Sequence, residues 1–288
     1  RWPEALAPPM RILLLGANGQ VGFELQRALA PLGELALATR SGKLPGGAPC
    51  LRADLADPVQ LAALLDVERP QLLVNAAAYT AVDRAEDEEP LATRINGTAV
   101  GEMADWCAGH GARLVHYSTD YVFDGSAAVP YTEGAPTAPV GAYGRSKLLG
   151  EQEVREGWIV RSSWLFGTAG RNFVETMLAL GQDQGDVVVV RDQVGCPTYT
   201  AHLADALVRL IDTNAYGIHH MAAGGQCSWW EFAREIFEQA GCEVVLAEDG
   251  FDALAKLSDN GPDIVFCDVL MPRLDGYQTC ALIKKSPR

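Results

Sequence analysis

The sequence predicts an α/β fold in which a doubly wound parallel sheet is covered by helices on both faces. Short, fully apolar runs alternate with longer runs of helical spacing, and a glycine-rich turn joins the first two of them. Strands that are apolar on both faces are typical of a parallel sheet between two helical layers. With 288 residues and 48% hydrophobic content, the chain is long enough to bury such a core.

The predicted elements follow one another as strand, helix and strand. Residues 11–15 form an apolar run that ends at a glycine, and residues 21–32 repeat apolar side chains every three or four positions. The further predicted strands are 35–38, 72–76 and 113–117, and the further predicted helices are 58–65 and 91–109. Because parallel strands need crossover connections, this order favours a parallel sheet.

Composition restricts the class of function. The formal net charge of -14, with acidic residues dispersed along the chain, argues against a nucleic-acid or anionic-membrane partner. No apolar run reaches membrane-spanning length. The seven cysteines show no zinc-site spacing, so we expect no metal and a reducing cytoplasm. We expect residues 1–9 to be a disordered leader, with Met10 as the natural start.

The glycine-rich turn after the first predicted strand indicates dinucleotide binding of the Rossmann type. Its glycines are spaced G-x-x-G-x-x-G, which allows the backbone to approach a pyrophosphate, and the helix N-terminus offers free N–H groups. The alternative is an ordinary glycine-rich turn. The residues expected at the cofactor are Gly16, Asn18, Gly19, Gln20, Val21 and Gly22.

Residues after the second and third predicted strands bear on which dinucleotide binds. NAD sites have an acid after the second strand, whereas this chain has Arg40, which can pair with a 2′-phosphate. NADPH is therefore the expected cofactor and NADH the alternative, and a solvated Arg40 is the competing interpretation. Asp54 and Leu55 are expected near the adenine. Asp54 could instead cap the helix that begins near residue 58.

Tyr143 and Lys147 are four residues apart, so a helix places both on one face. A nearby ammonium favours the phenolate and would lower the pKa of the phenol, which makes proton transfer to a carbonyl oxygen feasible near neutral pH. The spacing alone is weak evidence for a catalytic pair, because an exposed helix can have a tyrosine and a lysine four residues apart by chance.

Several separated motifs, in the same order along the chain, resemble the extended short-chain dehydrogenase/reductase family. Besides the glycine turn, they are residues 74–83, 116–123, 143–151, 161–167 and 192–198. The resemblance covers about residues 10–241. It implies a dinucleotide-binding domain and a smaller substrate lobe, with the lobe's segments mainly after residue 164.

The resemblance also implies roles for single residues. Tyr143 would be the proton donor, Lys147 would lower its pKa and hold the nicotinamide ribose, and Thr119 would orient the substrate oxygen. Small residues beside the cofactor, which tight helix–sheet packing could equally explain, are Ala76, Ala77 and Ala78. The expected substrate-binding residues are Thr119, Asp120, Tyr121, Tyr143, Trp164 and Asn172. His116 has no metal-ligand spacing, and we expect it to be structural.

The activity implied by the resemblance is reduction of the C4 ketone of dTDP-4-dehydro-6-deoxy-L-mannose to dTDP-L-rhamnose, with NADPH as hydride source. The partner would be this small nucleotide sugar, and a homodimer is compatible with the resemblance. One alternative is another NAD(P)-dependent sugar-nucleotide reductase or epimerase, although Arg40 speaks against an epimerase. A second alternative is a two-component signalling protein, because the last part of the sequence resembles a receiver domain.

Residues 242–288 resemble the middle of a response-regulator receiver domain, with Asp268 as the implied phospho-acceptor. The fragment lacks the acidic pair that holds Mg²⁺ in receivers, so we expect no working phosphoswitch, which incubation with a small phosphodonor would test. The fragment takes the place of the reductase's last segment. The substrate lobe is therefore expected to be incomplete, with substrate affinity more affected than cofactor binding. A designed fusion, a natural recombination and a faulty join of two genes are possible origins, and we favour the last.

Overall fold

The structure is a computed structural model that describes residues 9–182, 189–242, 250–256, 265 and 276–285. The chain divides into two compact units. The first unit comprises Arg1–Gly170 and Thr198–Ala222, and the second comprises Arg171–Pro197 and Ala223–Arg288. In the described part of the chain, the helices are too short or too polar to cross a membrane.

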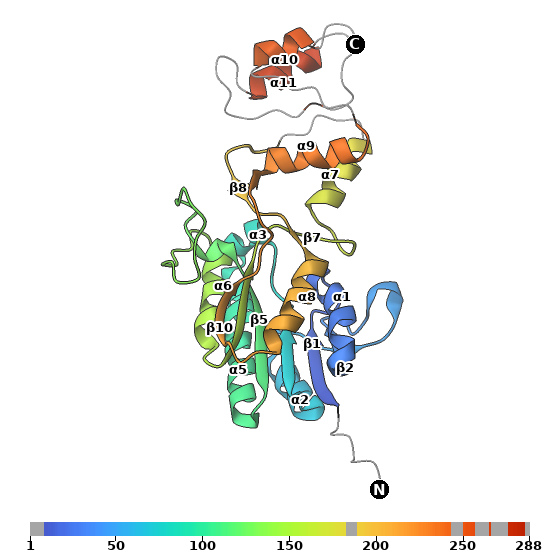
Figure 1. The fold of residues 1–288 in the computed structure, drawn as a ribbon, viewed down its shortest axis with the longest axis vertical. Coiled ribbons are helices and arrows are strands. Elements are labelled where there is room, and N and C mark those ends of the chain that lie inside the picture. The colour runs from blue at the N-terminus through green and yellow to red at the C-terminus, as the bar shows by residue number, and fades with distance from the viewer. Residues whose placement is uncertain (1–8, 183–188, 243–249, 257–264, 266–275, 286–288) are drawn as a thin grey trace. The chain divides into compact units, whose positions relative to one another are not determined.

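The first unit is built on a seven-stranded sheet with the strand order β10-β6-β5-β4-β1-β2-β3 (Figure 1). The strands are β1 (Met10–Leu15), β2 (Gly33–Thr39), β3 (Leu51–Arg52), β4 (Leu72–Asn75), β5 (Arg113–Thr119), β6 (Gly157–Ser162) and β10 (Gly217–His220). Every pairing within it is parallel. The predicted parallel α/β sheet is therefore confirmed.

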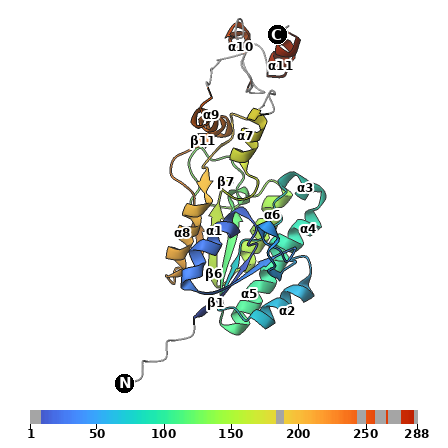
Figure 2. The ribbon, with the colours of Figure 1, turned by 90° about the vertical axis from the view of Figure 1, so that its right-hand side faces the viewer.

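Helices cover both faces of this sheet, as Figure 2 shows. One layer contains α1 (Gln20–Leu29) and α8 (Thr200–Ile211), and the other contains α2 (Pro58–Glu68) and α5 (Ala99–His110). Successive strand residues point to opposite faces, so β1 contributes to both cores. Ile12 and Leu14 pack in the core of the first layer. Leu13 and Leu15 pack in the core of the second.

The helix predicted over residues 91–109 is present, and it contains a π-helical turn that the prediction did not include. The structure has α4 (Glu89–Thr93), a π-helical turn (Arg94–Thr98) and then α5. The buried Asn96 side chain in this turn bonds both backbone groups of Tyr79, at 2.8 and 3.0 Å. The wide turn thus coincides with a buried polar contact to a distant segment, which helical periodicity does not reveal.

Two helix ends also differ from the prediction. The helix expected over residues 21–32 ends at Leu29, and a 3₁₀ turn containing Pro31 follows, because proline has no N–H to continue the α-helical ladder. Asp57 caps α2 by accepting from the N–H groups of Val59 and Gln60. The alternative prediction that Asp54 caps this helix is wrong.

The second unit contains two short strands and four helices among its described residues (Figure 1). They are α7 (Phe173–Gln182), β8 (Val194–Gly195), β11 (Cys227–Ser228), α9 (Trp229–Gln239), α10 (Gly250–Lys256) and α11 (Gly276–Lys285). The strands β8 and β11 pair antiparallel. Helices α7 and α9 share an apolar cluster that includes Met177 and Phe237.

Helix α9 has well-formed ends. Ser228 and Glu231 form a capping box at its start. At its end Gly241 takes a φ of 81°, and the N–H groups of Gly241 and Cys242 bond the carbonyls of Glu238 and Phe237. This is a Schellman motif, so the helix stops at the glycine that precedes the receiver-like sequence.

A buried ion pair fixes α6 (Ala142–Glu153) on the sheet. Arg161 of β6 donates to both carboxylate oxygens of Glu151, at 2.6 and 2.8 Å, and both side chains are almost fully buried. The Ser118 hydroxyl of β5 donates to the same carboxylate at 2.5 Å. A bidentate buried pair sets the position of the helix, and it is costly to break from one side.

We expect Arg161→Leu to lower the free energy of unfolding by about 3–5 kcal/mol, because it leaves the Glu151 carboxylate buried without its partner. The matched control is Arg145→Leu, since Arg145 pairs with Glu89 at the surface, where the side chains are 43% and 42% exposed. That change is expected to cost less than about 1 kcal/mol. Urea unfolding measures the loss of stability in both variants, and equal losses would contradict the stabilising role of the buried Arg161–Glu151 pair.

Candidate active site

Lys147 lies on the face of α6 that packs against β5, and it is only 2% exposed. Its Nζ donates to the carbonyl oxygen of Tyr117 at 2.5 Å and lies 3.4 Å from His116 Nε2. Burial lowers the pKa of Lys147 to about 8, and the negative charge of Glu151 opposes this shift. The lysine can therefore change its protonation state close to neutral pH.

Tyr143 lies one turn earlier on α6, close to the end of β5. Thr119 is the last residue of β5, two residues beyond the predicted end of the strand. Burial raises the pKa of the Tyr143 phenol to about 12, and a hydrogen bond with the Thr119 side chain opposes this shift. The structure thus brings together all three residues predicted to be catalytic.

One part of that prediction needs correction. Lys147 was expected to lower the pKa of Tyr143, whereas burial raises this pKa, and the opposing contact comes from Thr119. The lysine amine is instead bonded to the Tyr117 carbonyl. At neutral pH the Tyr143 phenol keeps its proton, as a proton donor must.

Asp120 and Tyr121 lie immediately beside this cluster. Asp120 accepts a hydrogen bond from the Thr119 hydroxyl at 3.0 Å, and burial raises the pKa of the Asp120 carboxyl. The ring of Tyr121 meets the ring of Tyr143 edge to face, with 5.5 Å between their centroids. Both residues therefore shape the surroundings of the phenol.

The glycine turn lies against the ends of β2 and β4. The N–H groups of Gly16 and Ala17 donate to the carbonyl of Ala38. A Cβ on Gly22 would overlap the Gly16 carbonyl oxygen, and a Cβ on Gly16 would overlap the backbone of residues 76 and 77. Gly16 also has a φ of 78°, a value that favours glycine. These positions require glycine, and the turn lies against the small residues predicted to lie beside the cofactor.

The first turn of α1 provides anion-binding groups. Gly19 occupies the N-cap position and has no side chain to bond the N–H groups of that turn. These groups and the positive end of the helix dipole suit a pyrophosphate. The residues present therefore fit a dinucleotide phosphate.

The other predicted cofactor residues divide into exposed and buried positions. Arg40 is exposed on the turn directly after β2. Asp54 is partly buried and accepts from the N–H of Ala56 at 3.0 Å. Leu55 is 5% exposed and packs in the α2–α5 core. Ala78 is partly buried, as are the two alanines before it.

Two predicted substrate residues lie in different units. Trp164, in the first unit, has a φ of 45°, and its carbonyl accepts from the N–H of Thr198 at 3.1 Å. A bulky side chain at positive φ is strained, and such residues concentrate at functional sites. Asn172, in the second unit, accepts from the N–H of Glu175 at 3.0 Å at the start of α7. A helix-capping contact therefore accounts for part of its placement.

Sequence reasoning missed Asn96 and Ser146. The Asn96 amide donates to the Ser146 hydroxyl at 3.0 Å, and this hydroxyl donates to the Tyr143 carbonyl at 2.7 Å. A chain of hydrogen bonds thus joins the π-helical turn to the helix that carries Tyr143 and Lys147. The sequence signal for this contact was an asparagine within a run of helical spacing, and that signal is weak by itself.

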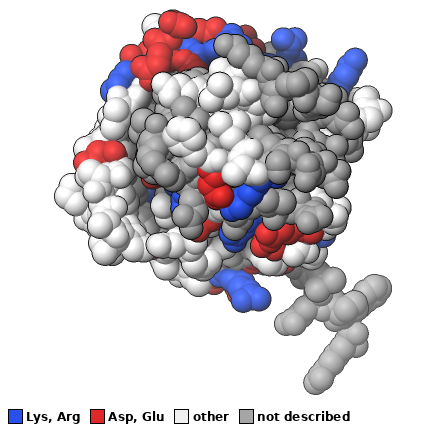
Figure 3. Space-filling model, turned by 90° about the horizontal axis from the view of Figure 1, so that it is seen from above, with Lys and Arg blue, Asp and Glu red and all other residues white. Residues whose placement is uncertain are grey.

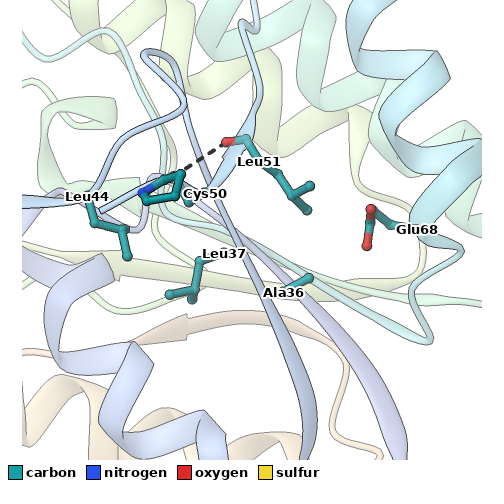
Figure 4. A pocket seen from close by; sticks show the side chains of 7 residues that line it. Ala36, Leu37, Leu44, Cys50, Leu51 and Glu68 are labelled. Atoms are coloured by element: carbon teal, nitrogen blue, oxygen red, sulfur yellow. Dashed lines mark hydrogen bonds between the residues drawn. The ribbon is translucent and has the colours of Figure 1, made fainter. Parts of the chain in front are cut away.

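An open apolar pocket lies beside β2 and β3, away from these residues (Figure 4). It is lined by Ala36, Leu37, Leu44, Pro49, Cys50, Leu51 and Glu68. None of the predicted catalytic, cofactor or substrate residues lines it. In the described part of the chain, no cluster of three or more His, Cys, Asp or Glu residues could hold a metal ion. The described atoms of the face in Figure 3 show acidic and basic side chains interspersed, without a continuous basic field.

Comparison with known proteins identifies the family. Residues 10–255 match the profile of the RmlD substrate binding domain. The chain belongs to this family. Residues 228–288 also match the response regulator receiver domain. Asp268, the predicted phospho-acceptor, lies outside the described residues.

Several similar proteins are described as dTDP-4-dehydrorhamnose reductases. The dTDP-4-dehydrorhamnose reductase of Burkholderia thailandensis is 44% identical over 240 residues, which cover 79% of this chain and 77% of that protein. The Escherichia coli K12 enzyme of the same description is 42% identical over 241 residues, 80% of this chain and 78% of that protein. A solved dTDP-4-dehydrorhamnose reductase from Bacillus anthracis, in complex with NADP, has 36% identity and a TM-score of 0.76, covering 90% of this chain and 84% of that chain.

Proposed function

We propose that the chain reduces the C4 ketone of dTDP-4-dehydro-6-deoxy-L-mannose to dTDP-L-rhamnose with NADPH. The observation that carries the proposal is the grouping of Thr119, at the end of β5, with Tyr143 and Lys147, on the first two turns of α6. Relatives that are 44% and 42% identical and are described as dTDP-4-dehydrorhamnose reductases support the choice of substrate.

The cofactor site we propose consists of the glycine turn and the residues around it. The backbone from Gly16 to Gly22 would hold the pyrophosphate, and the exposed Arg40 would pair with the 2′-phosphate. Asp54 and Leu55 would lie near the adenine, and residues 76–78 beside the nicotinamide half. When bound, NADPH supplies a hydride. The bound NADP of the Bacillus anthracis structure supports this cofactor.

In the proposed reaction, the ketone oxygen gains negative charge as its carbon is reduced, and this charge must be met by hydrogen bonds and a proton. The Thr119 hydroxyl would orient the oxygen. The Tyr143 phenol, protonated at neutral pH, would give its proton to the oxygen and complete the alcohol. Lys147 would hold the nicotinamide ribose and return a proton to the site.

We propose that Asp120, Tyr121, Trp164 and Asn172 contribute to the sugar-nucleotide site. Tyr121 contacts the ring of Tyr143, and the strained backbone of Trp164 lies two residues after β6. The assignment of Asn172 to this site has less support, because its side chain also caps α7.

The domain organisation we propose has a reductase over residues 10–241 and a receiver-derived segment over 242–288. The receiver match at the end of the chain and the helix stop at Gly241 support this boundary. We further propose a cytoplasmic location, which is supported by the dispersed spacing of the seven cysteines along the chain. A homodimer stays a prediction, and analytical ultracentrifugation would check it.

A second candidate substrate is a related dTDP-4-keto sugar. A dTDP-4-keto-6-deoxy-D-glucose reductase from Streptomyces niveus is 40% identical over 238 residues. Comparing turnover with the two keto sugars would separate the candidates.

We expect Tyr143→Phe to lower kcat by about 10²- to 10⁴-fold, because the ketone oxygen loses its proton donor. NADPH binding should change little, since the ring remains. Loss of NADPH absorbance measures turnover, and cofactor fluorescence measures binding. Tyr216→Phe is the matched control, since Tyr216 lies at the surface, 46% exposed. Undiminished turnover in Tyr143→Phe would reject the assignment.

Arg40→Ala is expected to raise the KM for NADPH by about 10- to 100-fold, because a hydrogen-bonded charge pair with the 2′-phosphate contributes about 1.5–3 kcal/mol. The KM for NADH should hardly change. Steady-state kinetics with each cofactor measures both values. Arg209→Ala, which removes an exposed arginine of α8, is the control. An equal effect on both cofactors would contradict the proposed role.

A further inference from the structure

Asn75, the last residue of β4, is fully buried and has a fixed orientation. Its side-chain oxygen accepts a hydrogen bond from the backbone N–H of Ala77 at 3.2 Å. The opposite orientation would bring the side-chain NH₂ group against that N–H, and the two donors would oppose each other. The amide nitrogen of Asn75 therefore points away from the turn, and it lies 3.2 Å from His116 Nδ1.

This contact selects one tautomer of His116. Because the Asn75 amide nitrogen is a donor, Nδ1 of the imidazole must accept. A neutral ring then carries its proton on Nε2. The ring is completely buried, and Gly150 of α6 packs so closely on it that a Cβ there would lie 3.2 Å from Nε2. His116 thus has little freedom to turn.

The Nε2–H group faces the amine of Lys147, with 3.4 Å between the two nitrogens. An ammonium offers only donors, so a protonated Lys147 would meet Nε2–H as donor against donor. A neutral amine has a lone pair that can accept from this group. The bond from Lys147 to the Tyr117 carbonyl is available to both forms, because a neutral amine keeps two hydrogens.

We propose that His116 is a positioning residue for Lys147, presenting Nε2–H to the amine and so favouring the form of the lysine that has released its proton. This inference gives His116 a role beyond a structural one, and its importance for turnover rests on the proposed function. After Tyr143 has given up its proton, the ammonium form of Lys147 can release a proton to the site, and the neutral amine that remains is the form that Nε2–H favours.

Each of the other titratable groups around Lys147 is a group that raises the pKa of the lysine, a member of an ion pair, or a neutral group. Glu151, one turn later on α6, raises the pKa of Lys147. Its charge is shared with Arg161 of β6, through the buried ion pair. The Tyr143 phenol, on the preceding turn, is neutral near pH 7. Burial and the charge of Lys147 lower the pKa of His116, so the imidazole stays neutral.

The direct test is ¹⁵N NMR of the imidazole nitrogens in the wild-type protein. The protein has five histidines, and His116→Gln identifies the signal of interest. We expect His116 to be in the Nε2–H tautomer and to stay neutral from about pH 6 to 9. A ring in the Nδ1–H tautomer, or a charged ring, would overturn the proposal. This readout needs no turnover, so it is independent of the proposed function.

A second test is the pH profile of kcat. His116→Phe keeps a ring but has no Nε2–H, so the midpoint that reports Lys147 should rise by about one pH unit. His116→Gln, whose amide N–H can reach the same place, should restore the midpoint. A merely structural role would lower stability and leave the midpoint unchanged, and that result would contradict the proposal.

Discussion

The bond between the buried Lys147 amine and the Tyr117 carbonyl is the contact on which the site depends. Taking an amine that can carry a charge out of water costs several kcal/mol, so the surrounding structure must compensate for it. Helix α6 approaches the neighbouring backbone closely, because a Cβ on Gly144 or Gly150 would overlap a carbonyl oxygen. The Arg161–Glu151 pair then anchors the end of the helix. Much of the packing around α6 thus serves to hold one lysine.

The parallel sheet gives this lysine its neighbours. Because the strands run in the same direction, the ends of β1, β2, β4 and β5 meet at one edge, where loops can bring functional groups together. The glycine turn follows β1, Arg40 follows β2, and Thr119 ends β5. The proposed cofactor cradle and the proposed proton donor are therefore consequences of strand order, with each residue contributed by a different part of the sequence.

The fold was largely predictable, because alternating apolar runs and a glycine turn are local patterns. The grouping of Tyr143, Lys147 and Thr119 was predictable through family resemblance. The contacts inside the group were not. Helical spacing places Tyr143 and Lys147 on one face, but it does not show that β5 offers a carbonyl to the amine. The same limit applies to Asn96, whose partners lie 17 and 50 positions away. Such contacts depend on packing between distant segments.

We infer that Lys147 is buried for chemistry and not for stability. The most direct measurement is urea unfolding and turnover of Lys147→Met, which replaces a buried amine with an apolar side chain of similar length. We expect the free energy of unfolding to fall by no more than about 2 kcal/mol, because the Tyr117 carbonyl loses a donor while an ionisable group no longer has to be buried. Turnover should fall at least about 100-fold. A strongly destabilised variant whose folded fraction turns over at the wild-type rate would contradict the account.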